Sequence, residues 1–172
     1  IIFKNIMKMK DFKKIITQEI INHGFDTIGF SKPLVDQKTK KRYQDFLSKN
    51  YHADMKWLVR HYEKKVNPKK IWGKVKTIIV IGQNYAPGEN PLYLNHNKNL
   101  ANISVYAGNE DYHVIMKDKL SKIKLWFQNK FNIETKIFVD TSPILEKYFA
   151  EKAGLGWQGK HTNIVSKEFG SW

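Results

Sequence analysis

An acidic residue followed by a glycine-rich segment near the C-terminal end constrains the fold of this chain more than any other feature. Asp140 follows residues 135–139, an apolar run of strand length, and Ser142-Pro143 then supply residues preferred at the start of a helix. Loops at such junctions can aim side chains and backbone amides at a ligand because a rigid scaffold holds them. The sequence therefore predicts an α/β fold with a functional site at this junction.

Helical and extended patterns alternate along the rest of the chain. From the spacing of apolar residues and from capping residues, we expect helices at residues 10–23, 40–48, 55–59, 111–130 and 142–153, and strands at 25–30, 76–81, 103–106, 135–139 and 163–165. The run at residues 76–81 is almost continuously apolar, which predicts a central strand buried on both faces. We therefore predict a single α/β domain over residues 1–172, with a central mixed β-sheet flanked by helices.

The chain carries a large positive charge and has no cysteine. Its 172 residues include 30 Lys and Arg against 16 Asp and Glu, a net charge of +14. Such an excess attracts polyanions, nucleic acid above all, although AT-rich coding also produces lysine-rich chains. The absence of cysteine excludes disulfides, thiolate-bound zinc and iron–sulfur clusters held by this polypeptide alone. No apolar run reaches the roughly 18 residues of a membrane span, so we expect no membrane partner and a cytoplasmic location.

The glycine-rich segment resembles two nucleotide-binding motifs without satisfying either. Residues 154–159 match G-x-G-x-x-G, and Lys160 brings them within one residue of a phosphate-binding loop. Both motifs need a strand before the glycines and a helix after them, whereas the patterns here predict the reverse. We interpret the segment as a helix-terminating turn that lets the backbone approach a large, flat ligand. Lys160 then forms a salt bridge nearby or meets an anionic group of that ligand.

The residues alone leave two interpretations open for Asp140. A carboxylate that caps the following helix would be stabilised by the helix dipole by about 0.3–1 kcal/mol. A catalytic acid would instead need desolvation to raise its pKa toward neutrality. The same choice exists at the start of the helix predicted for residues 111–130. There Asp111 suits an N-cap, and Tyr112 and His113 point in different directions within the first turn.

Taken together, these segments resemble the N-terminal cobalamin-binding domain of the epoxyqueuosine reductases. The matching segments, in chain order, are residues 24–30, 55–58, 64–68, 78–85, 106, 111–113, 139–143, 146–147, 153–157, 159–160 and 169–172. The resemblance implies an oxidoreductase of queuosine biosynthesis that reduces epoxyqueuosine to queuosine in the anticodon loop of tRNA. It also implies a bound base-off cobalamin and electrons from 4Fe-4S clusters in a ferredoxin-like domain.

The resemblance also implies roles for individual residues. Asp140 corresponds by its motif to the family's proton donor, and Lys65 stands where many relatives carry an arginine near the cofactor. The residues expected to line the corrin, together with these two, are Ser104, Gly159, Lys160 and Ile164. Asp111, Tyr112 and His113 are expected near the same cleft, on the substrate side. No side chain is expected to bind a metal directly.

The family's cluster-binding cysteines lie beyond the point that corresponds to Trp172. We therefore expect a chain truncated before the ferredoxin-like iron–sulfur domain, which would need a separate iron–sulfur polypeptide for activity. Two alternatives remain open from the sequence: a truncated, inactive remnant, or a cofactor-free basic module that binds RNA.

Overall fold

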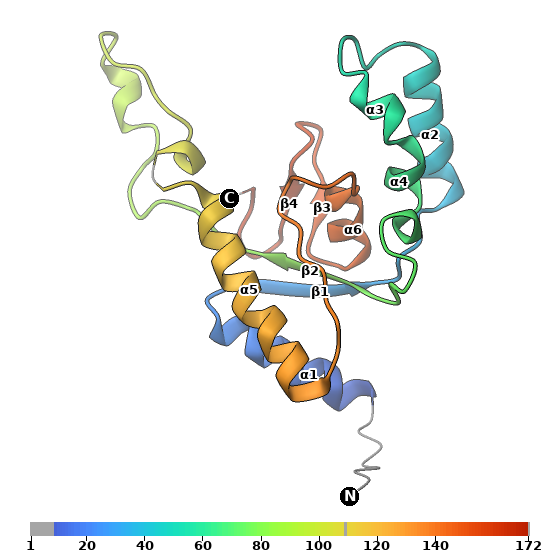
Figure 1. Cartoon of the computed structure of the whole chain (residues 1–172). Coiled ribbons are helices and arrows are strands. Elements are labelled where there is room, and N and C mark those ends of the chain that lie inside the picture. The colour runs from blue at the N-terminus through green and yellow to red at the C-terminus, as the bar shows by residue number, and fades with distance from the viewer. Residues whose placement is uncertain (1–8, 109, 172) are drawn as a thin grey trace, which may run out of the picture. The chain divides into compact units, whose positions relative to one another are not determined.

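The computed structural model describes residues 9–108 and 110–171 and combines helices with short strands (Figure 1). The helices are α1 (Met9–Asn22), α2 (Gln37–Ser48), α3 (Trp57–Arg60), α4 (Tyr62–Val66), α5 (Tyr112–Phe131) and α6 (Glu146–Lys152). Three short 3₁₀ helices add η1 (Pro68–Lys70), η2 (Tyr93–His96) and η3 (Val105–Ala107). In the described residues, β1 (Thr27–Ser31) pairs with β2 (Ile78–Gly82), and β3 (Trp157–Gln158) pairs with β4 (Ile164–Val165).

The chain divides into two compact units. Unit 1 comprises Ile1–Ile28, Ile81–Val139 and Lys167–Trp172, and unit 2 comprises Gly29–Val80 and Asp140–Ser166. The prediction of a single domain over residues 1–172 stays a prediction. Of the helices that the structure describes, none combines the length and the apolar character needed to cross a membrane.

In unit 1 the apolar faces of α1 and α5 form the core. Ile16 and Ile20 of α1 are buried, and α5 buries Leu120, Ile123 and Phe127. The rings of Phe12 and Phe131 meet edge to face, with centroids 4.9 Å apart. Both helices had been predicted from their 3.6-residue periodicity, and the structure confirms them to within two residues of their predicted ends.

The core of unit 2 is built on the short helix α6. Phe149 is 1% exposed and packs with Val35 and Tyr148, and partly buried side chains surround the three: Ile78, Val80, Ile144 and Leu145. A seven-residue helix is too short to be stable alone, so this packing has to stabilise it. The chain leaves α6 through Gly154, whose φ of 85° is a conformation that glycine adopts without strain.

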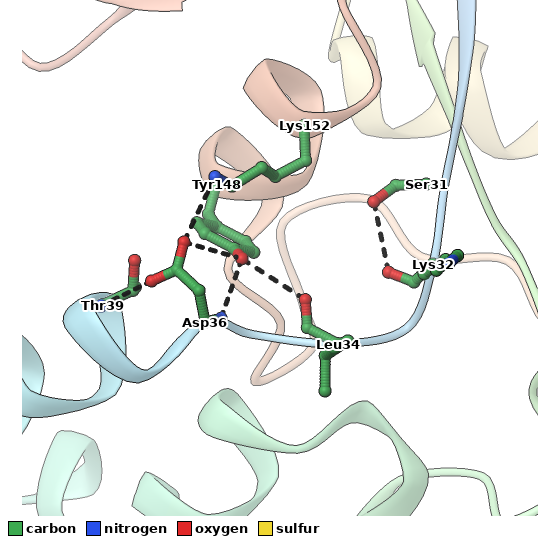
Figure 2. Close-up of polar contacts among 7 residues, drawn as sticks. All are labelled: Ser31, Lys32, Leu34, Asp36, Thr39, Tyr148 and Lys152. Carbon is green, nitrogen blue, oxygen red and sulfur yellow. Dashed lines mark hydrogen bonds and ion pairs between the residues drawn. The ribbon is translucent and has the colours of Figure 1, made fainter.

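A polar network links α6 to the start of α2 (Figure 2). Asp36 caps α2 by accepting a hydrogen bond from the Thr39 amide at 2.7 Å, and its carboxylate lies 3.2 Å from Lys152 Nζ. The Asp36 amide donates to the Tyr148 hydroxyl at 2.9 Å. The hydrogen bonds from Thr39, and after them the interaction with Lys152, hold the pKa of Asp36 well below its ordinary value. The network therefore connects two segments that lie far apart in the sequence.

Three expectations drawn from the sequence are wrong. Residues 103–106 were predicted as a strand, but η3 occupies Val105–Ala107. Residues 135–139 were predicted as a strand, yet they belong to none of the strands in the described part of the chain. Ser142 does not cap α6, because its carbonyl accepts from the Ile144 amide at 2.7 Å in a turn that delays the helix to Glu146. A run of apolar residues predicts that a segment is buried, but burial alone does not mean that a neighbouring strand pairs with it.

The predicted central sheet is not confirmed. The residues of β2 are half-buried along its whole length, and β2 pairs with β1 in a sheet of two strands. What the structure establishes is the coarser class, a mixture of helices and small β-sheets.

The contact between Gly29 and the end of α6 generates a first prediction. A Cβ at Gly29 would lie inside contact distance of the Ala153 carbonyl oxygen and the Leu155 side chain. Because backbone atoms cannot move aside cheaply, we expect Gly29→Ala to lower the free energy of unfolding by about 1–3 kcal/mol, measured by urea denaturation. Gly73→Ala is the matched control, since a Cβ there has no heavy atom within 4 Å. Equal stability of the two variants would contradict this account of the packing.

Candidate functional site

A cleft of about 1130 Å³ in unit 2 is the candidate site. Side chains of α2, α3, α4, the loop before α6, and α6 itself line it, among them Tyr43, Trp57, His61, Lys65, Asp140 and Glu146. Cofactor and small-molecule pockets usually measure roughly 300–1,000 Å³ and combine apolar walls with a few polar groups. The cleft therefore has room for a large cofactor, and both apolar and polar side chains line it.

The backbone of Asp140 is in an unusual conformation. Its φ of 52° lies in the left-handed region, which costs a non-glycine residue about 1–3 kcal/mol. The Asp140 amide donates a hydrogen bond to Glu146 Oε1 at 3.2 Å, which ties the turn to the first residue of α6. The carboxylate of Asp140 is exposed on the cleft wall. Strained backbone that is held in this way is concentrated at functional sites.

Glu146 has a strongly raised proton affinity. Its burial, and next the negative charge of Asp140 beside it, raise the pKa of Glu146 from 4.5 to about 7. A hydrogen bond between the two side chains acts in the same direction. The hydrogen bond from the Asp140 amide, and after it the positive charge of Lys65, lower the pKa of Glu146 and oppose these effects. At neutral pH this carboxyl group therefore carries a proton in a substantial fraction of molecules.

Lys65 contributes the positive charge of the site. Burial lowers the pKa of Lys65, and the charge of Glu146 partly offsets that effect. Its Nζ lies 5.1 Å from the centroid of the Trp57 ring, a cation–π distance. A carboxyl group and an ammonium group with shifted proton affinities in one cleft are typical of a functional site. Among residues 9–108 and 110–171, no group of three or more His, Cys, Asp or Glu is placed to hold a metal ion.

The glycine-rich segment forms a β-hairpin after α6. The Gly159 amide donates to the Asn163 carbonyl at 2.8 Å, and Ile164 pairs with Gln158 across the hairpin. A Cβ at Gly156 would clash with the Val165 carbonyl, so this glycine accommodates the chain's own second strand. The glycines thus lead into a strand rather than a helix, which agrees with rejecting a nucleotide-binding loop. Of this segment Gln158 lines the cleft.

The sequence-predicted site residues fall into both units. Lys65 and Asp140 line the cleft of unit 2. Gly159, Lys160 and Ile164 belong to the same unit but lie in the hairpin, where the Lys160 side chain is exposed. Ser104, Asp111, Tyr112 and His113 belong to unit 1. Their predicted roles toward cofactor and substrate stay predictions.

Asp111, Tyr112 and His113 form an ordered group at the start of α5. Asp111 caps the helix by accepting from the His113 amide at 2.9 Å, as the sequence predicted, and His113 Nδ1 lies 2.8 Å from the same carboxylate oxygen. These contacts lower the pKa of Asp111, the backbone hydrogen bond most of all. The rings of Tyr112 and His113 stack with centroids 4.1 Å apart.

The residue of the candidate site that the sequence did not single out is Glu146. Its position suited the first turn of a helix, where a carboxylate is favourable in any protein. The sequence feature that could have identified Glu146 is its spacing, because it lies six residues after Asp140 across a turn. That spacing brings the two groups together only if the helix starts at Glu146 rather than at Ser142.

Known proteins resemble this chain in sequence. A family model described as "Epoxyqueuosine reductase QueG, DUF1730" matches residues 65–141. The epoxyqueuosine reductase of Leadbetterella byssophila is 34% identical over 165 residues, which cover 95% of this chain and 53% of that protein. The epoxyqueuosine reductase of Escherichia coli K12 is 35% identical over 152 residues, covering 87% of this chain and 40% of that protein.

Solved structures resemble it in fold. The crystal structure of an epoxyqueuosine reductase with an epoxyqueuosine-modified tRNA-Tyr stem loop has a TM-score of 0.77 and 25% identity, and the match covers 96% of this chain and 44% of that one. The epoxyqueuosine reductase of Streptococcus thermophilus shares the fold with a TM-score of 0.75 at 24% identity, covering 94% and 44%.

The chain is similar in fold and sequence to a family of reductases. It is similar to part of the epoxyqueuosine reductases, which confirms the resemblance expected from its sequence. The chain spans about half the length of the curated relatives it matches.

The altered proton affinity of Glu146 generates a second prediction. Folding raises the pKa of this group, so the folded protein binds the proton more tightly than the unfolded chain. The stabilisation that this group contributes is therefore fully present below about pH 4.5 and is lost as the pH rises through about 7. We expect the wild type to lose about 2 kcal/mol of unfolding free energy over this range relative to Glu146→Gln. Denaturation at several pH values measures it.

Glu63→Gln is the control, because Glu63 is an exposed carboxylate on α4 outside the cleft. Its pH profile should parallel that of the wild type. A Glu146→Gln profile that is also parallel would show that folding leaves the proton affinity of Glu146 unchanged.

Proposed function

We propose that this chain is the cobalamin-binding part of an epoxyqueuosine reductase, which reduces epoxyqueuosine to queuosine in the anticodon loop of tRNA. The observation that carries the proposal is the cleft of about 1130 Å³ with the strained Asp140 on its wall. The similarity to epoxyqueuosine reductases over 95% of the chain supports it.

The residues of the cleft suit cobalamin. The corrin is a broad, flat ring with amide side chains, and it needs both flat apolar contacts and hydrogen-bonding groups. The cleft offers the rings of Tyr43 and Trp57 and the polar groups of Lys65, Asp140 and Ser142. Lys65 and Asp140 would hold the cofactor, and we propose Ser104, Gly159, Lys160 and Ile164 as further contacts. Bound cobalamin would supply the reducing chemistry of its cobalt for removal of the epoxide oxygen.

Asp140 would act as the proton donor to the departing oxygen. Its carboxyl group is exposed in the cleft, so a substrate can reach it, and Glu146 lies beside it. A general acid contributes about 10²- to 10⁴-fold to a rate when its proton is available at the working pH. Asp111, Tyr112 and His113 would contact the substrate side of the site.

The remaining parts of the reaction involve partners. The 172 residues contain no cysteine, so the 4Fe-4S clusters that deliver electrons have to be bound elsewhere, and we propose a separate iron–sulfur polypeptide. The net charge of +14 suits the phosphates of tRNA, whose anticodon base would be splayed into the cleft. A reaction on tRNA is consistent with a cytoplasmic location.

The same charge favours a second candidate function. A basic module without a cofactor, or an inactive remnant, would retain tRNA with a steep dependence on salt and would not bind cobalamin. Binding of the corrin therefore distinguishes the two candidates.

Cobalamin binding is the first test of the proposal. We expect the protein to bind cobalamin in the base-off form, seen as a change in the visible absorption spectrum. Lys65→Ala should weaken binding because it removes a half-buried ammonium group from the cleft, whereas the exposed Lys69→Ala should not. A spectrum identical to that of free cobalamin would favour the cofactor-free module.

The role of Asp140 is tested in the protein supplied with an iron–sulfur partner. Asp140→Asn keeps the shape of the side chain but has no proton to donate, so turnover should fall about 10²- to 10⁴-fold with cobalamin binding retained. Mass spectrometry of the tRNA nucleosides measures the queuosine formed. Asp45→Asn, an exposed carboxylate of α2, should turn over like the wild type. Unchanged turnover in Asp140→Asn would refute the proton-donor role.

A further inference from the structure

We propose that Glu146 holds the proton that Asp140 delivers, so that the two carboxyl groups act as one proton-donating pair. The inference rests on the proposed function of Asp140 and assigns a role to a second residue of the same site. Glu146 acts through Asp140 and need not touch the substrate.

Geometry joins the two residues. The Asp140 amide donates to Glu146 Oε1 at 3.2 Å, and both side chains line the same cleft. Asp140 is exposed, while Glu146 is half-buried at the first residue of α6, which the core fixes through Tyr148 and Phe149. The arrangement therefore sets one carboxyl group where a substrate can reach it and the other beside it, partly shielded from water.

Electrostatics decide where the proton resides. Burial and the charge of Asp140 raise the pKa of Glu146 to about 7. Two adjacent carboxyl groups do not readily lose both protons, because their negative charges would repel each other. Near neutrality the pair therefore retains one proton. Asp140 itself is exposed on the cleft wall.

Other charges in the cleft moderate this effect without removing it. Lys65 on α4 is the positive group that lowers the pKa of Glu146, and its effect is the smallest of those acting on that carboxyl group. The remaining charged side chains that line the cleft are Lys38 and Arg42 of α2, His61 before α4, Lys147 and Glu151 of α6, and the mutually paired Asp36 and Lys152.

The proton balance is simple. The pair starts with one proton, which Glu146 holds. This proton moves from Glu146 to Asp140, and Asp140 passes it to the acceptor oxygen, which leaves both groups as carboxylates. Glu146 then regains a proton from water in the open cleft. No electron changes hands in these steps.

The first experiment needs neither cofactor nor tRNA. Carbon-13 NMR of the side-chain carboxyl of Glu146 should give a titration midpoint near 7 in the wild type and a clearly lower one in Asp140→Asn, because the neighbouring charge is gone. Asp45→Asn should leave the midpoint unchanged. A Glu146 midpoint near 4.5 in the wild type, or one that Asp140→Asn does not move, would overturn the pair.

The second experiment separates proton supply from a purely structural role. In the protein with cobalamin and its iron–sulfur partner, the rate of Glu146→Gln should begin to fall at a pH about two units more acidic than in the wild type. A structural role would lower the rate equally at every pH, and that outcome would overturn the inference. A wild type without turnover would refute the proposed function, and the titration would still decide whether the carboxyl pair exists.

Discussion

Burial of one short helix is the constraint on which unit 2 and its cleft depend. The seven residues of α6 cannot hold a helical conformation by their own hydrogen bonds, so the burial of Tyr148, Phe149 and Ala150 has to stabilise it. The first residue of the same helix, Glu146, lies in the cleft. Because core and site residues share two helical turns, the position of the site follows from the packing of the core.

The strain at Asp140 belongs to the same arrangement. A left-handed aspartate persists only where surrounding contacts specify it, and the hydrogen bond from its amide to Glu146 is such a contact. That bond also places two carboxyl groups side by side in a protein whose net charge is +14. Local burial and the neighbouring charge therefore determine the proton affinity of Glu146, while the positive field of the whole molecule acts on larger anionic partners.

Under the proposed function, a chain that spans about half the length of its relatives would carry out part of a reaction. The cleft would supply groups that bind and protonate, and the iron–sulfur clusters, which need cysteine ligands, would be bound outside these 172 residues. A proton-donating pair within one unit would allow that half of the chemistry to be studied by titration without the electron route.

The sequence by itself determined the long helices, the cap at Asp111, the end of a helix at the glycine segment with an extended segment after it, and the resemblance to epoxyqueuosine reductases. These features depend on local periodicity, capping chemistry or ordered motifs, which a sequence records directly. It also selected Lys65 and Asp140, both of which line the cleft. The tertiary structure alone decided that residues 135–139 form none of the strands in the described part of the chain, that α6 starts at Glu146, and that Glu146 is half-buried beside Asp140. Strand pairing, burial and proton affinity all depend on neighbours distant in sequence, and only folding brings those neighbours together.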